Sequence, residues 1–157
     1  MLSNKPDISW FDTCKSSVQQ LHCEIVASPS TRSDPGSPEV AELAQRAAAI
    51  ALDHKANDLV VLSLKGLSDM TDYFIIASGT SDTHVRSVGE GIVEGLKKDG
   101  ATPHHVEGMT QGRWVLLDYV DFVVHLFHPA LRNFYQLERL WSDAQVVPVT
   151  APSAQAQ

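Results

Sequence analysis

The chain has 157 residues, of which 43% are hydrophobic and 20% are charged, and its formal net charge at pH 7 is −7. This length and composition indicate one soluble globular domain with tails, and no apolar run is long enough to cross a membrane. The acidic charge argues against direct, sequence-specific binding of nucleic acid, which requires a basic face, and favours basic protein partners.

Both cysteines, Cys14 and Cys23, lie in residues 1–37, a segment without sustained periodicity that ends in a Ser-, Pro- and Gly-rich stretch. This pair gives neither a disulfide framework nor a metal cluster, so a reducing cytoplasm is the expected location. The segment lacks an apolar signal region, and its acidic residues argue against a transit peptide. We expect residues 1–37 to form a disordered extension ending in a linker.

A first helix is expected from Pro38 to about Lys55. Ser37 is a suitable N-cap, Pro38 suits the first helical position, and Glu39 lies near the positive end of the helix dipole. The helix carries a narrow, Ala-rich apolar face that permits close packing onto a sheet. The following segment, Asp58–Leu64, is predicted to be a central strand because it is apolar on both faces.

The next apolar segment, Tyr73–Ala77, predicts a second buried strand, which Ser78–Asp82 connects to a helix over Thr83–Lys98. Gly100 is a natural residue to end that helix. The more polar segment Thr102–Glu107 predicts an edge strand.

Two short runs, Val115–Leu117 and Phe122–Phe127, are rich in β-branched and aromatic residues and predict strands joined as a hairpin. Pro129 opens a last helix. Residues 144–157 lose periodicity, so we expect a disordered tail there. The apolar face of the last helix is expected to carry Leu131, Phe134, Leu137, Leu140 and Trp141.

The expected element order is therefore α-β-β-α-β-β-β-α. It predicts an α/β domain over residues 38–143, with a mixed five-stranded sheet flanked by helices. Helices on both faces explain why most of the strands are apolar on both sides.

The loop Ser78–Ser81 lies between a strand and a helix, a position that can hold phosphate. It lacks a following Lys and matches neither glycine-rich fingerprint, which favours simple N-capping. The alternative is a nucleotide-dependent transferase that uses this loop with Asp118 and Asp121. Those two acids straddle a turn and would face opposite sides of a strand, whereas two-metal catalysis needs them on one face.

Four histidines make a zinc site conceivable: His104, His105, His125 and His128. The chain has no HExxH or CxxC motif to support such a site, and no GxSxG motif for a nucleophile. We therefore expect no metal, no cofactor and no enzymatic activity.

Trp114 lies beside Arg113 and next to a turn, so we expect its side chain to be partly exposed. Trp, Tyr and Arg are the residue types of interface hot spots, and an interface role and packing at the rim of the core are equally open for Trp114. Tyr135 and Trp141, on the last helix, are interpreted as core residues.

Several segments, in order, resemble the ribosomal silencing factor (Iojap/RsfS) family. They extend over about two thirds of the chain, Pro38–Asp143. Two departures are Ser63, where the family commonly has Asp, and Val120, where Gly is frequent and where Val implies a stiffer hairpin tip. The matching segments are Lys55–Leu62, Thr71–Ser81, Trp114–Asp118, Asp121–Phe127 and Tyr135–Trp141.

The resemblance implies a non-enzyme that binds ribosomal protein fourteen of the large subunit, on the surface that meets the small subunit. Members thereby block subunit joining and repress translation under nutrient limitation, and a part in large-subunit maturation is also implied. The implied fold is nucleotidyltransferase-like without the catalytic set, and free members are often homodimers. The implied partner-binding residues are Trp114, Leu116, Asp118, Tyr119 and Asp121 on the hairpin, with Thr71, Asp72 and Tyr73 at the entry to the second strand.

Overall fold

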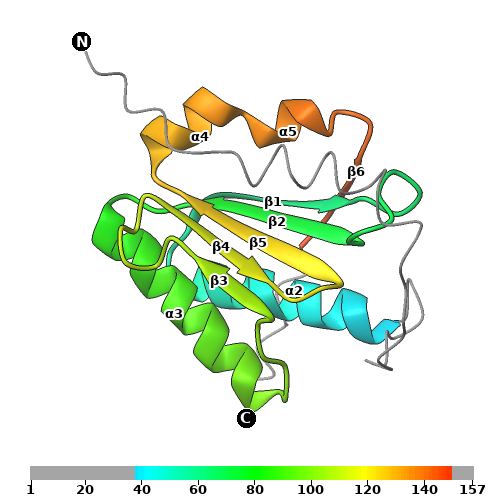
Figure 1. Cartoon of the computed structure of the whole chain (residues 1–157), viewed down its shortest axis with the longest axis horizontal. Helices are drawn as coiled ribbons and strands as arrows, with labels where there is room; N and C mark the ends of the chain where they lie inside the picture. The colour runs from blue at the N-terminus through cyan, green and yellow to red at the C-terminus, as the bar shows by residue number, and fades with distance from the viewer. Residues whose placement is uncertain (1–37, 150–157) are drawn as a thin grey trace, which may run out of the picture. The chain divides into compact units, whose positions relative to one another are not determined.

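The computed structural model describes residues 38–149, which form a six-stranded mixed sheet between two layers of helices (Figure 1). Residues 1–37, with the expected extension and both cysteines, and residues 150–157 lie outside the described residues. In chain order the elements are α2 (Pro38–Asp53), β1 (Asn57–Ser63), β2 (Tyr73–Ser78), α3 (Asp82–Lys98), β3 (His105–Glu107), β4 (Trp114–Asp118), β5 (Phe122–Phe127), α4 (Pro129–Tyr135), α5 (Leu137–Leu140) and β6 (Gln145–Val147).

The strands lie in the order β3-β4-β5-β2-β1-β6. The central pair, β2 and β5, is parallel and runs in register from Tyr73 opposite Phe122 to Ser78 opposite Phe127. All other pairs are antiparallel. The expected mixed α/β sheet flanked by helices is therefore confirmed.

The expectation of five strands and a structureless tail from residue 144 is wrong, because β6 pairs antiparallel with β1. Val146 lies opposite Leu62 and is 63% exposed, whereas Val147 is half-buried and packs against the core. A strand of this length is too short to show periodicity. Its pairing is a tertiary contact that covers part of the outer edge of β1.

One face of the sheet packs against α2 and α3, and the buried face of α2 is built mostly from alanine. A Cβ atom added at Gly95 of α3 would lie 2.5 Å from Cδ1 of Ile50 on α2, so the glycine allows the two helices to approach closely. This packing confirms the role expected for the Ala-rich face of the first helix. The buried alanines of α2 are Ala44, Ala47, Ala48, Ala49 and Ala51.

The opposite face carries α4 and α5, and here the expectation of one continuous helix is wrong. Gln136 adopts a left-handed conformation (φ 44°, ψ 54°) and divides the segment into two short helices. Because of the break, the residues expected to share one apolar face point in different directions. Phe134 is 66% exposed and Leu140 is 54% exposed, while Leu137 is buried. Helical spacing read across residue 136 could not reveal this change of direction.

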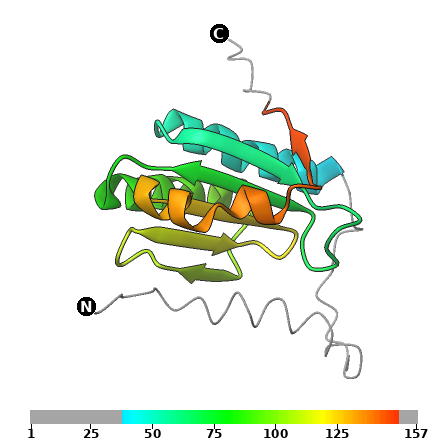
Figure 2. The same ribbon diagram turned by 90° about the horizontal axis from the view of Figure 1, so that it is seen from above.

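Figure 2 shows α4 and α5 crossing the middle of the sheet, whereas β3 and β4 are not covered by any described helix on that face. No helix within residues 38–149 has the length and apolar character needed to cross a membrane.

The β6 pairing predicts different responses at two neighbouring valines. Val147→Asp should lower the free energy of unfolding by about 2 kcal/mol, because it places a charge against the core. Val146→Asp, on the exposed side of the same strand, should change it by less than about 0.5 kcal/mol. Chemical denaturation of both variants checks this, and equal effects would contradict the strand assignment.

Candidate partner-binding surface

The predicted site residues fall into two groups at the two ends of β4. Trp114 begins the strand and Asp118 ends it, which separates them by about 14 Å at the rise of an extended strand. Trp114 and Leu116 lie on the face that carries α4 and α5. At the other end, Asp121 bonds to the loop between β1 and β2, and the carbonyl of Asp118 accepts from the amide of His104 beside β3.

At the first end, three aromatic side chains form what we call the aromatic patch: Trp114, Tyr135 and Phe134. The ring centroids of Trp114 and Tyr135 lie 4.9 Å apart, and those of Tyr135 and Phe134 lie 5.0 Å apart. Phe134 is exposed, and the other two are half-buried. The patch lies where the end of α4 meets the start of β4.

The structure confirms the partial exposure expected for Trp114 and corrects the interpretation of Tyr135 as a core residue. Desolvation raises the pKa of the Tyr135 phenol. Neither Tyr135 nor Phe134 was recognised from the sequence as a neighbour of Trp114. Only the helix break at Gln136 and the packing of α4 on β5 bring them together.

Beneath Trp114 lies His125, which is 2% exposed. The indole Nε1–H of Trp114 donates to His125 Nδ1 at 3.4 Å, and the ring of Phe74 meets the imidazole edge-on with centroids 5.0 Å apart. Accepting at Nδ1 places the proton of the neutral imidazole on Nε2. Burial lowers the pKa of His125 to about 3, so the histidine is neutral near physiological pH.

The four histidines considered for a zinc site do not gather into one ligand set. His128 caps α4 by accepting from the amide of Ala130 at Nδ1, while His104 and His105 lie at the exposed β3 edge. Among residues 38–149 no three His, Cys, Asp or Glu side chains are grouped as ligands for a metal ion.

At the other end of β4, two loops are joined by hydrogen bonds, and we call this region the acidic end. The amide of Asp72 donates to the carbonyl of Asp121 at 2.8 Å, and Thr71 Oγ1 donates to the same carbonyl at 3.0 Å. Asp118 Oδ1 accepts from the amide of Val120 at 2.8 Å. These bonds join the loop at Asp72 to the hairpin turn at Asp121 and hold the Asp118 carboxylate within that turn.

Val120 forms the tip of the hairpin with φ 73°, in the left-handed region, and its side chain is 40% exposed. A β-branched residue is strained in that conformation, whereas glycine adopts it freely. The turn geometry therefore gives a physical reason for the glycine that the family frequently has at this position.

Four of the predicted contact residues are more deeply buried than expected for a presented surface. Tyr119 stacks on Phe122 with centroids 4.7 Å apart, and burial raises the pKa of its phenol to about 12. These side chains support the surface from below and offer little area to a partner. The exposed fractions are 8% for Thr71, Leu116 and Tyr119, and 7% for Tyr73.

The geometry argues against the transferase alternative. The loop Ser78–Ser81 follows the carboxyl end of β2, whereas Asp118 and Asp121 lie at the opposite end of the sheet. Six residues of β2 separate them, about 17 Å along the strand. Ser81 is the N-cap of α3 and accepts from the amide of His84 at 3.2 Å, which confirms the simpler interpretation of that loop.

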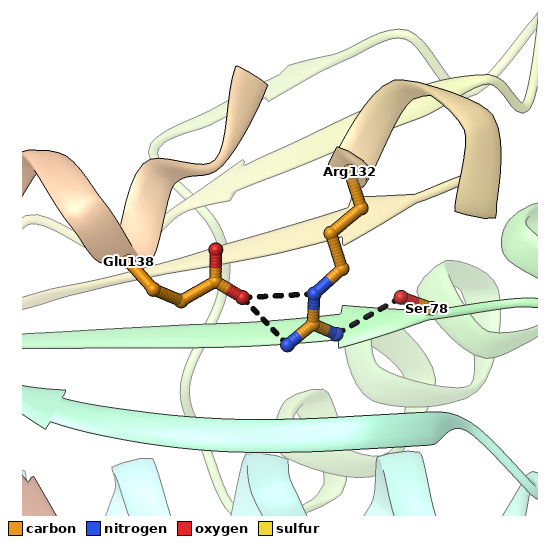
Figure 3. Close-up of polar contacts among 3 residues, drawn as sticks. All are labelled: Ser78, Arg132 and Glu138. Atoms are coloured by element: carbon orange, nitrogen blue, oxygen red, sulfur yellow. Dashed lines mark hydrogen bonds and ion pairs between the residues drawn. The ribbon is translucent and has the colours of Figure 1, made fainter. Parts of the chain in front are cut away.

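An arginine clamp, formed by Arg132, Glu138 and Ser78, holds the helical layer on the sheet (Figure 3). Arg132 Nε and Nη2 lie 2.8 and 2.6 Å from Glu138 Oε1, and Arg132 Nη1 donates to Ser78 Oγ at 2.9 Å. The Arg132 side chain is 13% exposed. The clamp connects α4, α5 and β2, and no spacing in the sequence predicted it.

Comparison with known proteins decides the family. A family model described as "Ribosomal silencing factor during starvation" matches residues 37–157. The chain belongs to the ribosomal silencing factor family. The resemblance drawn from the sequence motifs is thereby confirmed.

Similar family members come from several bacteria. The chain is 41% identical over 98 residues to the ribosomal silencing factor RsfS of Bacillus subtilis, covering 62% of this chain and 83% of that protein. It is 40% identical over 106 residues to RsfS of Halalkalibacterium halodurans, covering 68% and 91%. A mouse protein named "Mitochondrial assembly of ribosomal large subunit protein 1" is 33% identical over 103 residues, covering 61% of this chain and 45% of that protein.

Solved structures support the same assignment. A crystal structure of a Chromobacterium violaceum protein matches with a TM-score of 0.65 at 30% identity, covering 74% of this chain and 96% of that one. A Bacillus halodurans protein matches with a TM-score of 0.59 at 36% identity, covering 70% and 97%. Their mixed α/β fold agrees with the fold found here.

The buried His125 predicts acid sensitivity. Its folded-state pKa of about 3 lies below the usual value of 6.5, so the unfolded chain binds the extra proton first as the pH falls. The contribution of neutral His125 to the free energy of unfolding is complete above pH 6.5 and is lost between pH 6.5 and about 3. Over that range the free energy of unfolding should fall by up to about 1.4 kcal/mol per pH unit.

Urea denaturation at several pH values measures this dependence. His125→Phe should reduce the slope between pH 6.5 and 4, whereas His104→Asn, which changes an exposed histidine, should keep it. Identical slopes in the wild type and His125→Phe would show that another group is responsible.

Proposed function

We propose that this protein binds ribosomal protein fourteen of the large ribosomal subunit and prevents the small subunit from joining. Translation is thereby repressed when nutrients are limiting. Membership of the ribosomal silencing factor family supports the class of function. The observation that carries the choice of surface is the aromatic patch, where a half-buried Trp and Tyr meet an exposed Phe.

The aromatic patch has the properties of an interface anchor. Its rings are large and rigid, and they can bury apolar area against a partner with little loss of side-chain entropy. The N–H group of Trp114 already donates to His125 inside the protein. The exposed part of the indole is therefore apolar, so a partner meets it with aliphatic or aromatic groups and needs no hydrogen-bond acceptor there.

The acidic end complements the patch electrostatically. Asp121 bonds to Asp72 and shares a hairpin turn with Asp118, in a chain of net charge −7, and ribosomal proteins are basic. Charge contrast of this kind raises the association rate and fixes the orientation of docking. The two ends of β4 lie close enough to belong to one interface of standard size, about 800 Å² per partner.

The mechanism requires bulk and affinity, and we propose no catalysis, cofactor or metal. A domain of this size is roughly 30 Å across, enough to obstruct an approaching subunit once it is docked. The described residues do not bring the loop Ser78–Ser81 together with Asp118 and Asp121. That separation favours the non-enzymatic proposal over the transferase alternative.

The bacterial relatives favour action in the cytoplasm, where their ribosomes lie. The name of the mouse relative refers to assembly of the ribosomal large subunit, which supports a second role in maturation of that subunit. In the absence of the ribosomal partner, we propose that two copies associate as a homodimer.

Two half-buried tryptophans test the surface assignment. Trp114→Ala should weaken binding to purified ribosomal protein fourteen by about 2 kcal/mol or more, because it removes the anchor of the patch. Trp141→Ala is the matched control, since Trp141 packs inward on Phe74 with centroids 5.7 Å apart. It should lower the free energy of unfolding by about 2–3 kcal/mol and leave the affinity of the folded protein unchanged.

Affinity is measured by titration calorimetry and stability by chemical denaturation of each variant. Binding that survives Trp114→Ala, or is abolished by Trp141→Ala in a folded protein, would refute the assigned surface. Absence of wild-type binding would refute the proposed partner.

A further inference from the structure

We infer that Arg132 is a positioning residue for partner binding: its clamp to Glu138 and Ser78 holds Tyr135 against Trp114 and so assembles the aromatic patch. The inference rests on the proposed function for its effect on binding. Its effect on the free protein can be tested without any partner.

The helices that carry half of the patch have little apolar anchoring. None of the residues of α4 is buried, and Leu137 is the one buried residue of α5. Helices as short as these are unstable on their own and depend on tertiary contacts for their position. A polar contact that fixes α4 and α5 therefore carries more weight here than it would beneath a well-buried helix.

The geometry of the clamp suits this task. The guanidinium uses Nε and Nη2 toward one carboxylate and Nη1 toward a hydroxyl, so its fork joins three separate elements. Ser78 is buried at the end of β2, which gives the clamp a rigid base in the middle of the sheet. Arginine is suited to such a contact because its donors are held in a planar, preorganised arrangement.

The clamp also spans the helix break. Arg132 lies in α4 and Glu138 in α5, with the left-handed Gln136 between them, and the amide of Gln136 donates to the carbonyl of Arg132 at 2.8 Å. Joining the helices across this point fixes the angle between them. Without the ion pair, α4 could rotate about the break.

Such a rotation would act directly on the patch. Tyr135 follows Arg132 by three residues, about one helical turn, so the two side chains move together with α4. Trp114 belongs to β4 and is held separately by His125 and Phe127. Release of the clamp would therefore displace Tyr135 while leaving Trp114 in place, and the continuous patch would be divided.

A double-mutant cycle with purified ribosomal protein fourteen tests the inference. Arg132→Met keeps the aliphatic stem, removes the charge, and should raise the Kd about tenfold. In a Tyr135→Ala background the same change should raise the Kd less than about twofold, because no ring remains to be positioned. If Arg132 instead contacted the partner directly through its charge, Arg132→Met would raise the Kd by the same factor in both backgrounds. That result would overturn the inference.

Arg139→Met is the matched control. Arg139 lies in α5, is exposed, and contacts the side chain of Gln136 at 2.8 Å, so its replacement removes the same charge without opening the clamp. Its Kd should stay within about twofold of the wild type. A tenfold loss in this control would point to overall charge and would overturn the positioning role.

Amide hydrogen exchange of the free protein provides the partner-independent measurement. Arg132→Met and the milder Ser78→Ala should increase exchange at residues 130–140 and leave β2 and β5 protected. Unchanged exchange at residues 130–140 would overturn the clamp whether or not binding is observed. If wild-type protein fails to bind while exchange responds as expected, the proposed function fails and the clamp's control of α4 and α5 is retained.

Discussion

The parallel pairing of β2 with β5 is the constraint on which both ends of the surface depend. Because Tyr73 lies opposite Phe122, the chain entering β2 meets the turn entering β5, and Asp72 bonds to Asp121. Because Ser78 lies opposite Phe127 at the other end, the helix that follows β5 begins beside Ser78 and can be clamped to it by Arg132. A shift of this register by one residue would turn every side chain to the other face and disrupt both arrangements.

The two faces of the sheet serve different purposes. Alanines and glycines allow α2 and α3 to approach one face closely, and this interface contains most of the buried apolar core. The other face carries two short helices and is rich in aromatic side chains. The aromatic patch lies on this second face, where α4 meets β4.

Strands and helices with long apolar patterns could be predicted from the sequence, including the central strands and the helix beginning at Pro38. The helix break could not, since Gln136 gives no glycine or asparagine signal for its left-handed backbone. Trp114 was identified as a surface candidate from its position beside a turn. Its neighbour Tyr135 and the contact from Arg132 depend on packing between distant elements, which helical spacing does not report.

The central claim is that docking on the large subunit blocks subunit joining, and sedimentation of purified ribosomal subunits tests it most directly. Increasing amounts of the protein should sediment with the large subunit and reduce the fraction of joined ribosomes in parallel, with no binding to isolated small subunits. Joined ribosomes that persist when the large subunit is saturated with the protein would contradict the steric mechanism proposed here.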